Sequence, residues 1–227
     1  MPSPHATCPV PKGRGRRKAL LALAGLALAG VFALAAVPRL LPAPPLLDGV
    51  PFSRTVTDRN GVLLRVTSAA DGQIRLRTPL EDVSPSVVRS LLRYEDRYFY
   101  EHPGVNVPAL LRAAWSTLTG SRAIGASTVT MQTARMRLGL HTRTIAGKLG
   151  QIFWALRYEA HYEKAEILEA YLNLLPWGGN VAGIGAASLV HFGKPARQLT
   201  ASESASLAVV PQNPVARRPG TEAFRAA

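Results

Sequence analysis

After Ser84 the sequence contains repeated helix-start signals, each followed by apolar residues at helical spacing. Ser84-Pro85 pairs an N-cap with a proline at the first helical position, and Thr200 to Glu203 is a capping box. The first of these helices is expected to end at Glu95. Further helices are predicted from Asn106, over 128–138, over 142–158, over 164–174, over 183–191 and over 205–210. The pattern therefore predicts a mainly α domain.

Apolar spacing also predicts the inward faces of two of these helices. In the helix from Asn106 the predicted inward residues are Leu110, Leu111, Ala114, Trp115 and Leu118. In the helix that Thr142 is expected to cap, they are Ile145, Leu149, Ile152, Phe153 and Leu156. Before the helices, β-branched residues flank Asn60-Gly61 and predict a small hairpin. Asp71-Gly72 predicts another turn, followed by a strand over 73–77.

Residues 19–37 contain no charged or hydrogen-bonding side chain, and five basic residues precede them. As a helix this run would be roughly 28 Å long, close to the thickness of a bilayer's hydrocarbon core. We expect a single-pass anchor with its N-terminus in the cytoplasm. The alternative is a cleaved signal peptide, with Ala33-Leu34-Ala35 as the cleavage site.

This run divides the chain into four parts. Residues 1–18 form a basic cytoplasmic tail and 19–37 a transmembrane anchor, while 38–53 form a proline-rich tether and 54–227 the main domain. The main domain is then expected outside the cytoplasmic (inner) membrane. Cys8 is the only cysteine, so no internal disulfide can form.

The formal charge of +13 indicates an acidic partner, which could be nucleic acid, anionic lipid or a phosphorylated substrate. An exported domain rarely meets nucleic acid, so the location favours lipid or phosphate. The sequence has neither zinc-finger spacing nor a glycine-rich phosphate loop.

Glu95 and Asp96 lie in an aromatic-rich segment, 94–106. Apolar surroundings and a neighbouring like charge both raise the pKa of a carboxyl group, which suits a general acid or base. The alternative is a solvated helix end. In the same segment His102 has no second His or Cys at metal-ligand spacing, so a positioning role beside Pro103-Gly104 is favoured.

Small hydroxyl residues at a predicted helix start, Ser127 and Thr128, suit an anionic ligand. The simpler reading is an N-cap formed by Ser127. Arg135, Arg143 and Lys148 follow and could neutralise a diphosphate if they converge, although such charges are usually scattered and solvated. Glu169 lies on one helix face with Glu166, so we expect it to have a partner in the fold. A structural role, in which Glu169 pins another loop, and a catalytic role both stay open.

Four groups of these residues, taken in order, resemble the family 51 peptidoglycan glycosyltransferases, the domain found in class A penicillin-binding proteins. The groups are Glu95-Asp96-x-x-Phe99-x-x-His102-x-Gly104, Gly125-x-Ser127-Thr128-x-Thr130-x-Gln132, Arg143 with Lys148, and Lys164-x-x-Ile167-Leu168-Glu169-x-Tyr171-Leu172-Asn173. The resemblance covers about residues 55–220. It implies a lysozyme-like helical glycosyltransferase domain with a small β-hairpin annex and one N-terminal transmembrane helix.

The resemblance also implies an activity and roles for particular residues. The family polymerises lipid II outside the cytoplasmic membrane, with Glu95 as general base and inversion at the anomeric carbon. The leaving undecaprenyl diphosphate would be stabilised by Arg135, Arg143 and Lys148. The remaining substrate-binding residues would be Asp96, Phe99, His102, Arg112, Ser127, Thr128, Gln132 and Gln151. Structural motif residues would be Gly104, Gly125, Glu169, Tyr171 and Asn173. The expected partners are lipid II, the growing glycan chain, the membrane and cell-wall synthesis proteins, with no nucleic acid.

Two positions depart from the family pattern. Gln151 stands where most members have a glutamate, and Gly147 where they have an arginine. Because glutamine cannot ionise, it can serve neither as a base nor as a carboxylate metal ligand. No metal site is predicted and no cofactor is certain, while a divalent cation, Mg²⁺ or Mn²⁺, stays open.

No Ser-x-x-Lys segment of the penicillin-binding kind occurs, so transpeptidation is not expected of this chain. The family continues through another helix beyond the position of Ala227, which suggests a truncated or split product. Two other functions stay open: a lytic, sugar-cleaving transglycosylase with Glu95 as acid, and an inactive, truncated cell-wall-binding remnant.

Overall fold

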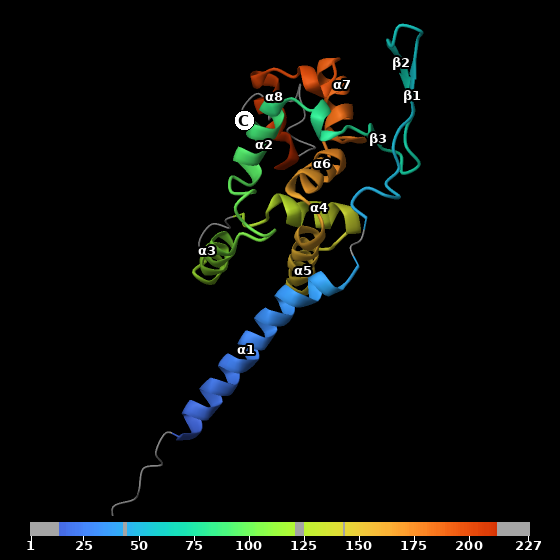
Figure 1. Ribbon diagram of the computed structural model, residues 1–227. Coiled ribbons are helices and arrows are strands. Elements are labelled where there is room, and N and C mark those ends of the chain that lie inside the picture. Colours follow the sequence, from blue (N-terminus) through green and yellow to red (C-terminus); the bar gives the residue numbers. More distant parts are fainter. Residues whose placement is uncertain (1–13, 43–44, 121–124, 143, 213–227) are drawn as a thin grey trace, which may run out of the picture. The chain divides into compact units, whose positions relative to one another are not determined.

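The computed structural model describes residues 14–42, 45–120, 125–142 and 144–212 (Figure 1). The chain divides into two compact units, residues 1–41 and 42–227. The described part of the first unit is the helix α1 (Arg14–Leu40), which contains Pro38. None of the helices in the described ranges is long and apolar enough to cross a membrane, so the structure does not confirm the predicted span over 19–37.

The second unit is mainly helical, as predicted. Its helices are α2 (Pro85–Glu95), α3 (Val107–Leu118), α4 (Val129–Leu138), α5 (Ile145–His161), α6 (Lys164–Leu174), α7 (Ile184–Phe192) and α8 (Ala201–Ala208). Short 3₁₀ turns lie at Leu80–Asp82, Ala196–Gln198 and Val210–Gln212. Every helix predicted in this unit is therefore present.

The predicted hairpin is also present. Strand β1 (Thr55–Thr57) pairs antiparallel with β2 (Leu63–Val66). The turn is held by Asp58, whose Oδ1 accepts from the backbone N–H groups of Asn60 and Val62, each at 2.8 Å. A second pair joins β3 (Ile74–Arg75) in parallel to β4 (Val181–Ala182), which links the annex to the loop before α7.

Local capping explains where several helices begin. The Ser84 hydroxyl accepts from the Ser86 N–H at the start of α2, and the predicted capping box of Thr200 and Glu203 starts α8. Two predicted caps were wrong. Thr128 rather than Ser127 caps α4, and α5 begins at Ile145 with Thr144 as its cap instead of Thr142.

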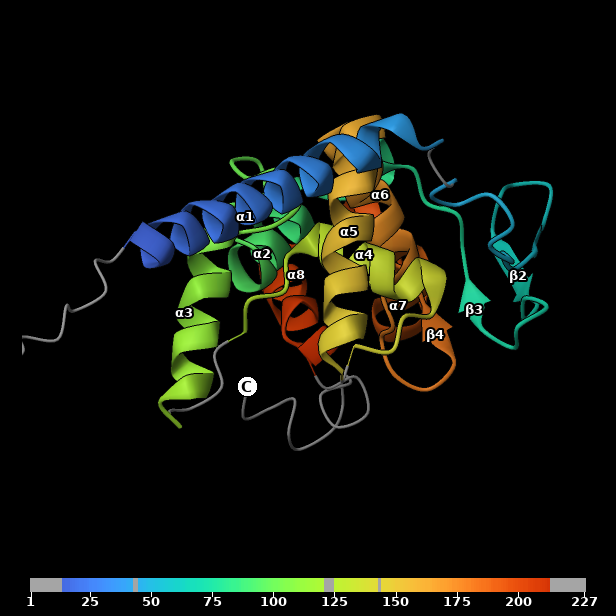
Figure 2. The same ribbon diagram turned by 90° about the horizontal axis from the view of Figure 1, so that it is seen from below.

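Helix α6 lies at the centre of the second unit, with α4, α5 and α7 packed against it (Figure 1 and Figure 2). It is buried on nearly all sides, through Ile167, Leu168, Ala170, Tyr171, Leu172 and Asn173. Burying one aliphatic side chain of this size contributes about 1.5–3 kcal/mol. This helix therefore contributes a substantial part of the apolar burial in the unit.

The predicted inward faces of α3 and α5 were wrong in part. Leu111 and Trp115 are 65% and 70% exposed, and Ile145 and Leu149 are exposed as well. An apolar stripe shows which face is apolar, but what covers that face depends on distant parts of the chain. Of the other predicted inward residues, Leu110, Ile152 and Leu156 pack against a small cluster of Val105, Met131 and Ala155, and Phe153 contacts the Trp154 ring. The side chains of Ala114 and Leu118 lie outside the described residues.

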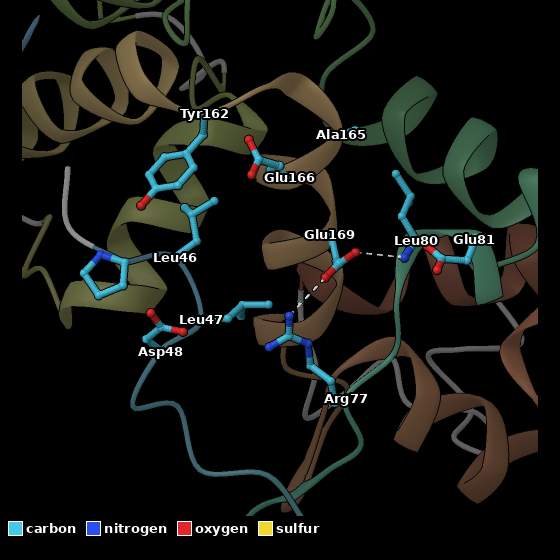
Figure 3. A pocket seen from close by; sticks show the side chains of 11 residues that line it. Leu46, Leu47, Asp48, Arg77, Leu80, Glu81, Tyr162, Ala165, Glu166 and Glu169 are labelled. Atoms are coloured by element: carbon cyan, nitrogen blue, oxygen red, sulfur yellow. Dashed lines mark hydrogen bonds and ion pairs between the residues drawn. The ribbon is translucent and has the colours of Figure 1, made fainter.

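Two polar side chains of α6 hold the segment that follows β3. The buried Asn173 accepts from Thr78 N–H at 2.9 Å and donates to Thr78 C=O at 2.8 Å. Glu169 accepts from the Leu80 N–H at 3.0 Å and from the Arg77 guanidinium at 3.4 Å (Figure 3). The prediction that Glu169 has a partner is thus confirmed, and of the two roles left open these contacts favour the structural one.

The Asn173 contacts yield a stability prediction. Asn173→Ala leaves a buried N–H and C=O of Thr78 without partners, so we expect it to lower the free energy of unfolding by about 2 kcal/mol or more. Asn180→Ala, at an exposed loop position, is the matched control and should stay within about 0.5 kcal/mol. Urea denaturation measures both, and equal stability of the two variants would contradict the pinning role.

Candidate active site

Glu95 is the last residue of α2, and its carboxylate is held on one side only. The helix ends there because the backbone of Asp96 is not helical, with φ −158° and ψ 75°. Gln132 on α4 donates from Nε2 to Oε2 of Glu95 at 2.9 Å. The second oxygen, Oε1, is buried and has no hydrogen-bond partner within the described part of the chain.

The surroundings of Glu95 favour its protonated form. Burial raises the pKa of its carboxyl group above the ordinary value, and the neighbouring charge of Asp96 raises it further. The hydrogen bond from Gln132 and the charge of Arg135 act in the opposite direction without cancelling the rise. The predicted direction and both predicted causes, desolvation and a like charge, are confirmed.

Glu95 opens into a polar cavity of about 230 Å³. The cavity is lined by Glu95, Ser127, Gln132, Arg135, Thr142, Gln151 and Pro211. Lys148 on α5 reaches two of these residues, because its Nζ donates to Ser127 Oγ at 2.7 Å and to Gln151 Oε1 at 2.9 Å. The structure thus brings the predicted carboxylate, hydroxyl and cations to one place. Arg143 lies outside the described residues.

The two cations disfavour each other. Burial lowers the pKa of Lys148, and the positive charge of Arg135 lowers it further. Two like charges at one cavity repel each other, and an anionic ligand would offset that repulsion. The arrangement therefore suits a ligand with more than one negative charge.

Asp96 and Thr128 are not among the residues that line the cavity. Their hydrogen bonds hold together the segments that carry the lining residues. The buried Asp96 carboxylate accepts from the Val129 N–H at 2.9 Å, at the start of α4, and lies 2.9 Å from His102 Nε2. Thr128 donates to the Gly104 carbonyl at 2.6 Å and accepts from the Met131 N–H at 3.1 Å. Together these bonds join the end of α2, the loop after it and the start of α4.

A partly buried ion pair extends this support to α6. Glu159 accepts from Thr130 at 2.5 Å and from Lys164 at 2.8 Å, and Lys164 also donates to the His102 carbonyl at 2.8 Å. Gly104 lies against this pair with φ +82°, and a Cβ there would come within 2.7 Å of Glu159 Cγ. Only glycine fits both the backbone angle and the space.

The other predicted residues are not among those that line this cavity. Phe99 is in the core with Lys164 Nζ 4.4 Å from its ring centre, and Gly125 is an exposed loop residue. His102 and Arg112 line a separate cavity of about 470 Å³. Tyr171 is fully buried on α6. The part that each of these residues plays in substrate binding stays a prediction.

Gln151 is oriented by its neighbours, which bears on the open question of a divalent cation. Its Nε2 donates to the Met131 carbonyl at 2.7 Å, which directs Oε1 to the Lys148 ammonium. A divalent cation at this oxygen would meet a positive charge. Within the described ranges no group of three or more His, Cys, Asp or Glu side chains is placed to hold a metal ion. The residues present at this position therefore do not fit a divalent cation.

Sequence reasoning missed three contributions to the site. It gave Asp96 no capping role, did not single out Glu159, and treated Thr142 as a helix cap rather than as part of the cavity wall. Glu159 carried a usable signal, because a charged residue on the apolar side of a helix needs a partner such as Lys164. The capping by Asp96 spans 33 residues and has no local signal.

Comparisons with known proteins identify relatives of this chain. A family model described as "Transglycosylase" matches residues 60–227. Penicillin-binding protein 1C of Escherichia coli (strain K12) is 47% identical over 182 residues, which are 80% of this chain and 23% of that protein. Penicillin-binding protein 2D of Bacillus subtilis (strain 168) is 37% identical, over 85% of this chain and 28% of that protein.

A shorter relative matches along most of its length. The biosynthetic peptidoglycan transglycosylase of Rhodospirillum centenum (strain ATCC 51521 / SW) is 38% identical over 198 residues, which are 87% of this chain and 80% of that protein. The chain therefore spans about a quarter of the two penicillin-binding proteins and most of this transglycosylase.

The orientation of Gln151 yields a prediction. In Gln151→Glu the donor to the Met131 carbonyl is lost and a carboxylate oxygen faces that carbonyl, so we expect a loss of about 1–3 kcal/mol in unfolding free energy at neutral pH. The loss should shrink as pH falls, because a protonated carboxyl can donate again. Denaturation at several pH values measures this. Gln198→Glu, at an exposed position, is the control, and an equal response of both variants would contradict the account.

Proposed function

The chain belongs to the transglycosylase family, and we propose from this that it is a peptidoglycan glycosyltransferase. In this proposal it polymerises lipid II into glycan strands and releases undecaprenyl diphosphate. One observation carries the proposal: the carboxyl group of Glu95, with its raised pKa, opens into the same cavity as Arg135, beside Lys148. A proton acceptor next to paired cations suits a reaction in which a hydroxyl group attacks and a diphosphate leaves.

In the proposed reaction each group has one role. The ionised carboxylate of Glu95 accepts the proton of the acceptor sugar's 4-hydroxyl while that oxygen attacks the anomeric carbon of the donor. The new carbon–oxygen bond forms as the bond to the diphosphate breaks, and the bonding electron pair leaves with the diphosphate, which inverts the anomeric carbon. Arg135 and Lys148, joined by Arg143, stabilise the departing charge.

Neutral polar side chains around the cavity support this chemistry, one as a hydrogen-bond donor and two as acceptors. Gln132 fixes one oxygen of Glu95, so the carboxylate is oriented before the substrate binds. Ser127 and Gln151 hold the Lys148 ammonium at the cavity wall. A raised pKa brings Glu95 nearer to the working pH, where a general base is most effective.

The same proposal places the domain at the outer face of the cytoplasmic membrane, with the lysozyme-like arrangement that the family implies. The apolar run 19–37, the basic residues before it and the lipid-linked substrate support an anchor with its N-terminus inside. We expect the chain expressed in bacteria to stay in membranes after alkaline extraction, with residues 42–227 protected from cytoplasmic protease. Recovery of the intact chain in the soluble fraction would contradict the anchor.

The role of Glu95 is tested by polymerisation of labelled lipid II. Glu95→Gln keeps the shape of the side chain but removes the proton acceptor, so the rate should fall by about 10²–10⁴-fold. Glu101→Gln, at an exposed position in the same segment, should keep the wild-type rate. The wild-type rate should fall with decreasing pH through a pKa above the ordinary glutamate value, since protonation removes the base.

Other outcomes of the same assay separate the alternatives. Equal rates for wild type and Glu95→Gln would remove Glu95 from its proposed role. Release of anhydro or reducing-end products from finished glycan would favour a lytic enzyme with Glu95 as acid. Tight binding of the lipid-linked substrate without turnover would favour an inactive remnant.

A further inference from the structure

The loop that follows Glu95 is closed on itself by two contacts of His102. Its ring atom Nε2 lies 2.9 Å from Oδ1 of Asp96, which joins the start of the loop to a residue six positions later. Its carbonyl accepts from the Gly104 N–H at 3.0 Å in a tight turn. Because Glu95 directly precedes Asp96, the orientation of this closed loop affects the direction in which the proposed base points.

Two hydrogen bonds attach the closed loop to the start of α4. The Val129 N–H donates to Asp96 at 2.9 Å, and the Thr128 hydroxyl donates to the Gly104 carbonyl at 2.6 Å. Two points of attachment leave rotation about the line that joins them. A third contact is therefore needed to fix the loop, and Glu95 with it, against α4.

Lys164, the first residue of α6, supplies a third contact. Its Nζ donates to the His102 carbonyl at 2.8 Å and lies 4.4 Å from the centre of the Phe99 ring, a cation–π distance. Phe99 is buried in the core. One ammonium group thus holds two residues of the loop, and it reaches them from α6 instead of from α4.

Glu159 on α5 links Lys164 to α4. Its Oε1 accepts from Lys164 Nζ at 2.8 Å and from the Thr130 hydroxyl on α4 at 2.5 Å. Thr130 is fully buried, and the side chains of Glu159 and Lys164 are 9% and 23% exposed. Water competes less with such bonds than with those of a surface ion pair, so the chain of contacts from Lys164 to Thr130 holds a defined geometry.

We propose that Lys164 is a positioning residue for the general base: it binds the loop after Glu95 and the Glu159 carboxylate at once, and so fixes the orientation of the base against α4. The proposal rests on the proposed function in that it treats Glu95 as the base. Gln132 lies two residues beyond Thr130 on α4 and donates to Glu95 at 2.9 Å, so this bond and the Lys164 contacts join the same two segments. Lys164 is not among the residues that line the cavity, and it acts through the loop.

A second ion pair provides a matched control. Lys194 Nζ lies 2.7 Å from Glu203 Oε2, and the two side chains are 26% and 23% exposed. Glu203 also accepts from Thr200 in the capping box that starts α8. Within the described ranges no hydrogen bond joins this pair to the loop after Glu95. Loss of this pair therefore removes an ion pair of the same kind without releasing that loop.

The first test is the rate of lipid II polymerisation. Lys164→Met keeps an unbranched apolar stem and removes the ammonium group, so kcat should fall by about tenfold to a hundredfold as the base loses its alignment. KM should stay unchanged, because the cations at the cavity are not altered. Lys194→Met should keep both constants. A wild-type kcat in Lys164→Met, or an equal fall in both variants, would overturn the proposal.

The second test needs no activity, because it follows the pKa of Glu95 by NMR in the full chain with ¹³C-labelled glutamate carboxyls. The Glu95→Gln spectrum identifies the signal. The hydrogen bond from Gln132 lowers this pKa, so Gln132→Met should raise the proton affinity of Glu95 by about threefold to tenfold. In the Lys164→Met background the increase should shrink to about half or less, since the donor is no longer held on Glu95.

The Lys194→Met background should keep the full increase. Removal of the Lys164 charge acts equally on both members of its pair of variants, as do the charges of Asp96, Arg135 and Lys148 near Glu95, so these effects cancel in the comparison. An increase of the same size in all backgrounds would overturn the proposal. If the wild type does not polymerise lipid II, the proposed function fails while this comparison still decides the inference.

A double variant covers the case in which Lys164→Met does not fold because the Glu159 carboxylate has lost its cation. Glu159→Gln combined with Lys164→Met removes both charges, and the amide oxygen of the new side chain can still accept from Thr130. This variant should show the same loss of kcat and the same reduced effect of Gln132→Met. Wild-type values for both would contradict the positioning role.

Discussion

The buried carboxylate of Asp96 joins the segments that make the site. It accepts from the Val129 N–H at the start of α4 and contacts His102 in the loop that follows α2. A negative charge is favourable at the N-terminus of a helix, so this contact also stabilises α4. Glu95 immediately precedes Asp96, and Gln132 lies one turn into α4. The Asp96 contacts therefore help to hold Gln132, the donor, at hydrogen-bond distance from Glu95, the proposed base.

The electrostatics of the site follow from this placement. Burial at the end of α2 raises the pKa of Glu95, while burial and Arg135 lower the pKa of Lys148. Each shift disfavours a charge that the proposed reaction needs. Burying these two charged groups therefore lowers the stability of the fold relative to leaving them solvated, which is the usual relation between active sites and folding stability. Binding of an acceptor hydroxyl and a diphosphate would offset both costs.

Local signals in the sequence were sufficient for most of the fold. The caps at Ser84 and Thr200 and the position of Glu95 at a helix end were predicted correctly, because each depends on a few neighbouring residues. The exposed Trp115 and Leu149 were not, because periodicity does not show what covers an apolar face. Thr128 caps α4, while the Ser127 hydroxyl accepts from Lys148, 21 residues later, and a contact over that separation has no local signature.

The most direct test of the central claim is a structure of the chain with an acceptor sugar and a lipid diphosphate bound together. The account predicts the acceptor 4-hydroxyl within hydrogen-bond reach of Glu95, roughly 2.6–3.2 Å. It also predicts diphosphate oxygens on Arg135 and Lys148, in the cavity that Ser127 and Gln151 line. A diphosphate bound elsewhere, for example in the cavity beside Glu169 and Arg77, with Glu95 far from any sugar hydroxyl, would contradict it.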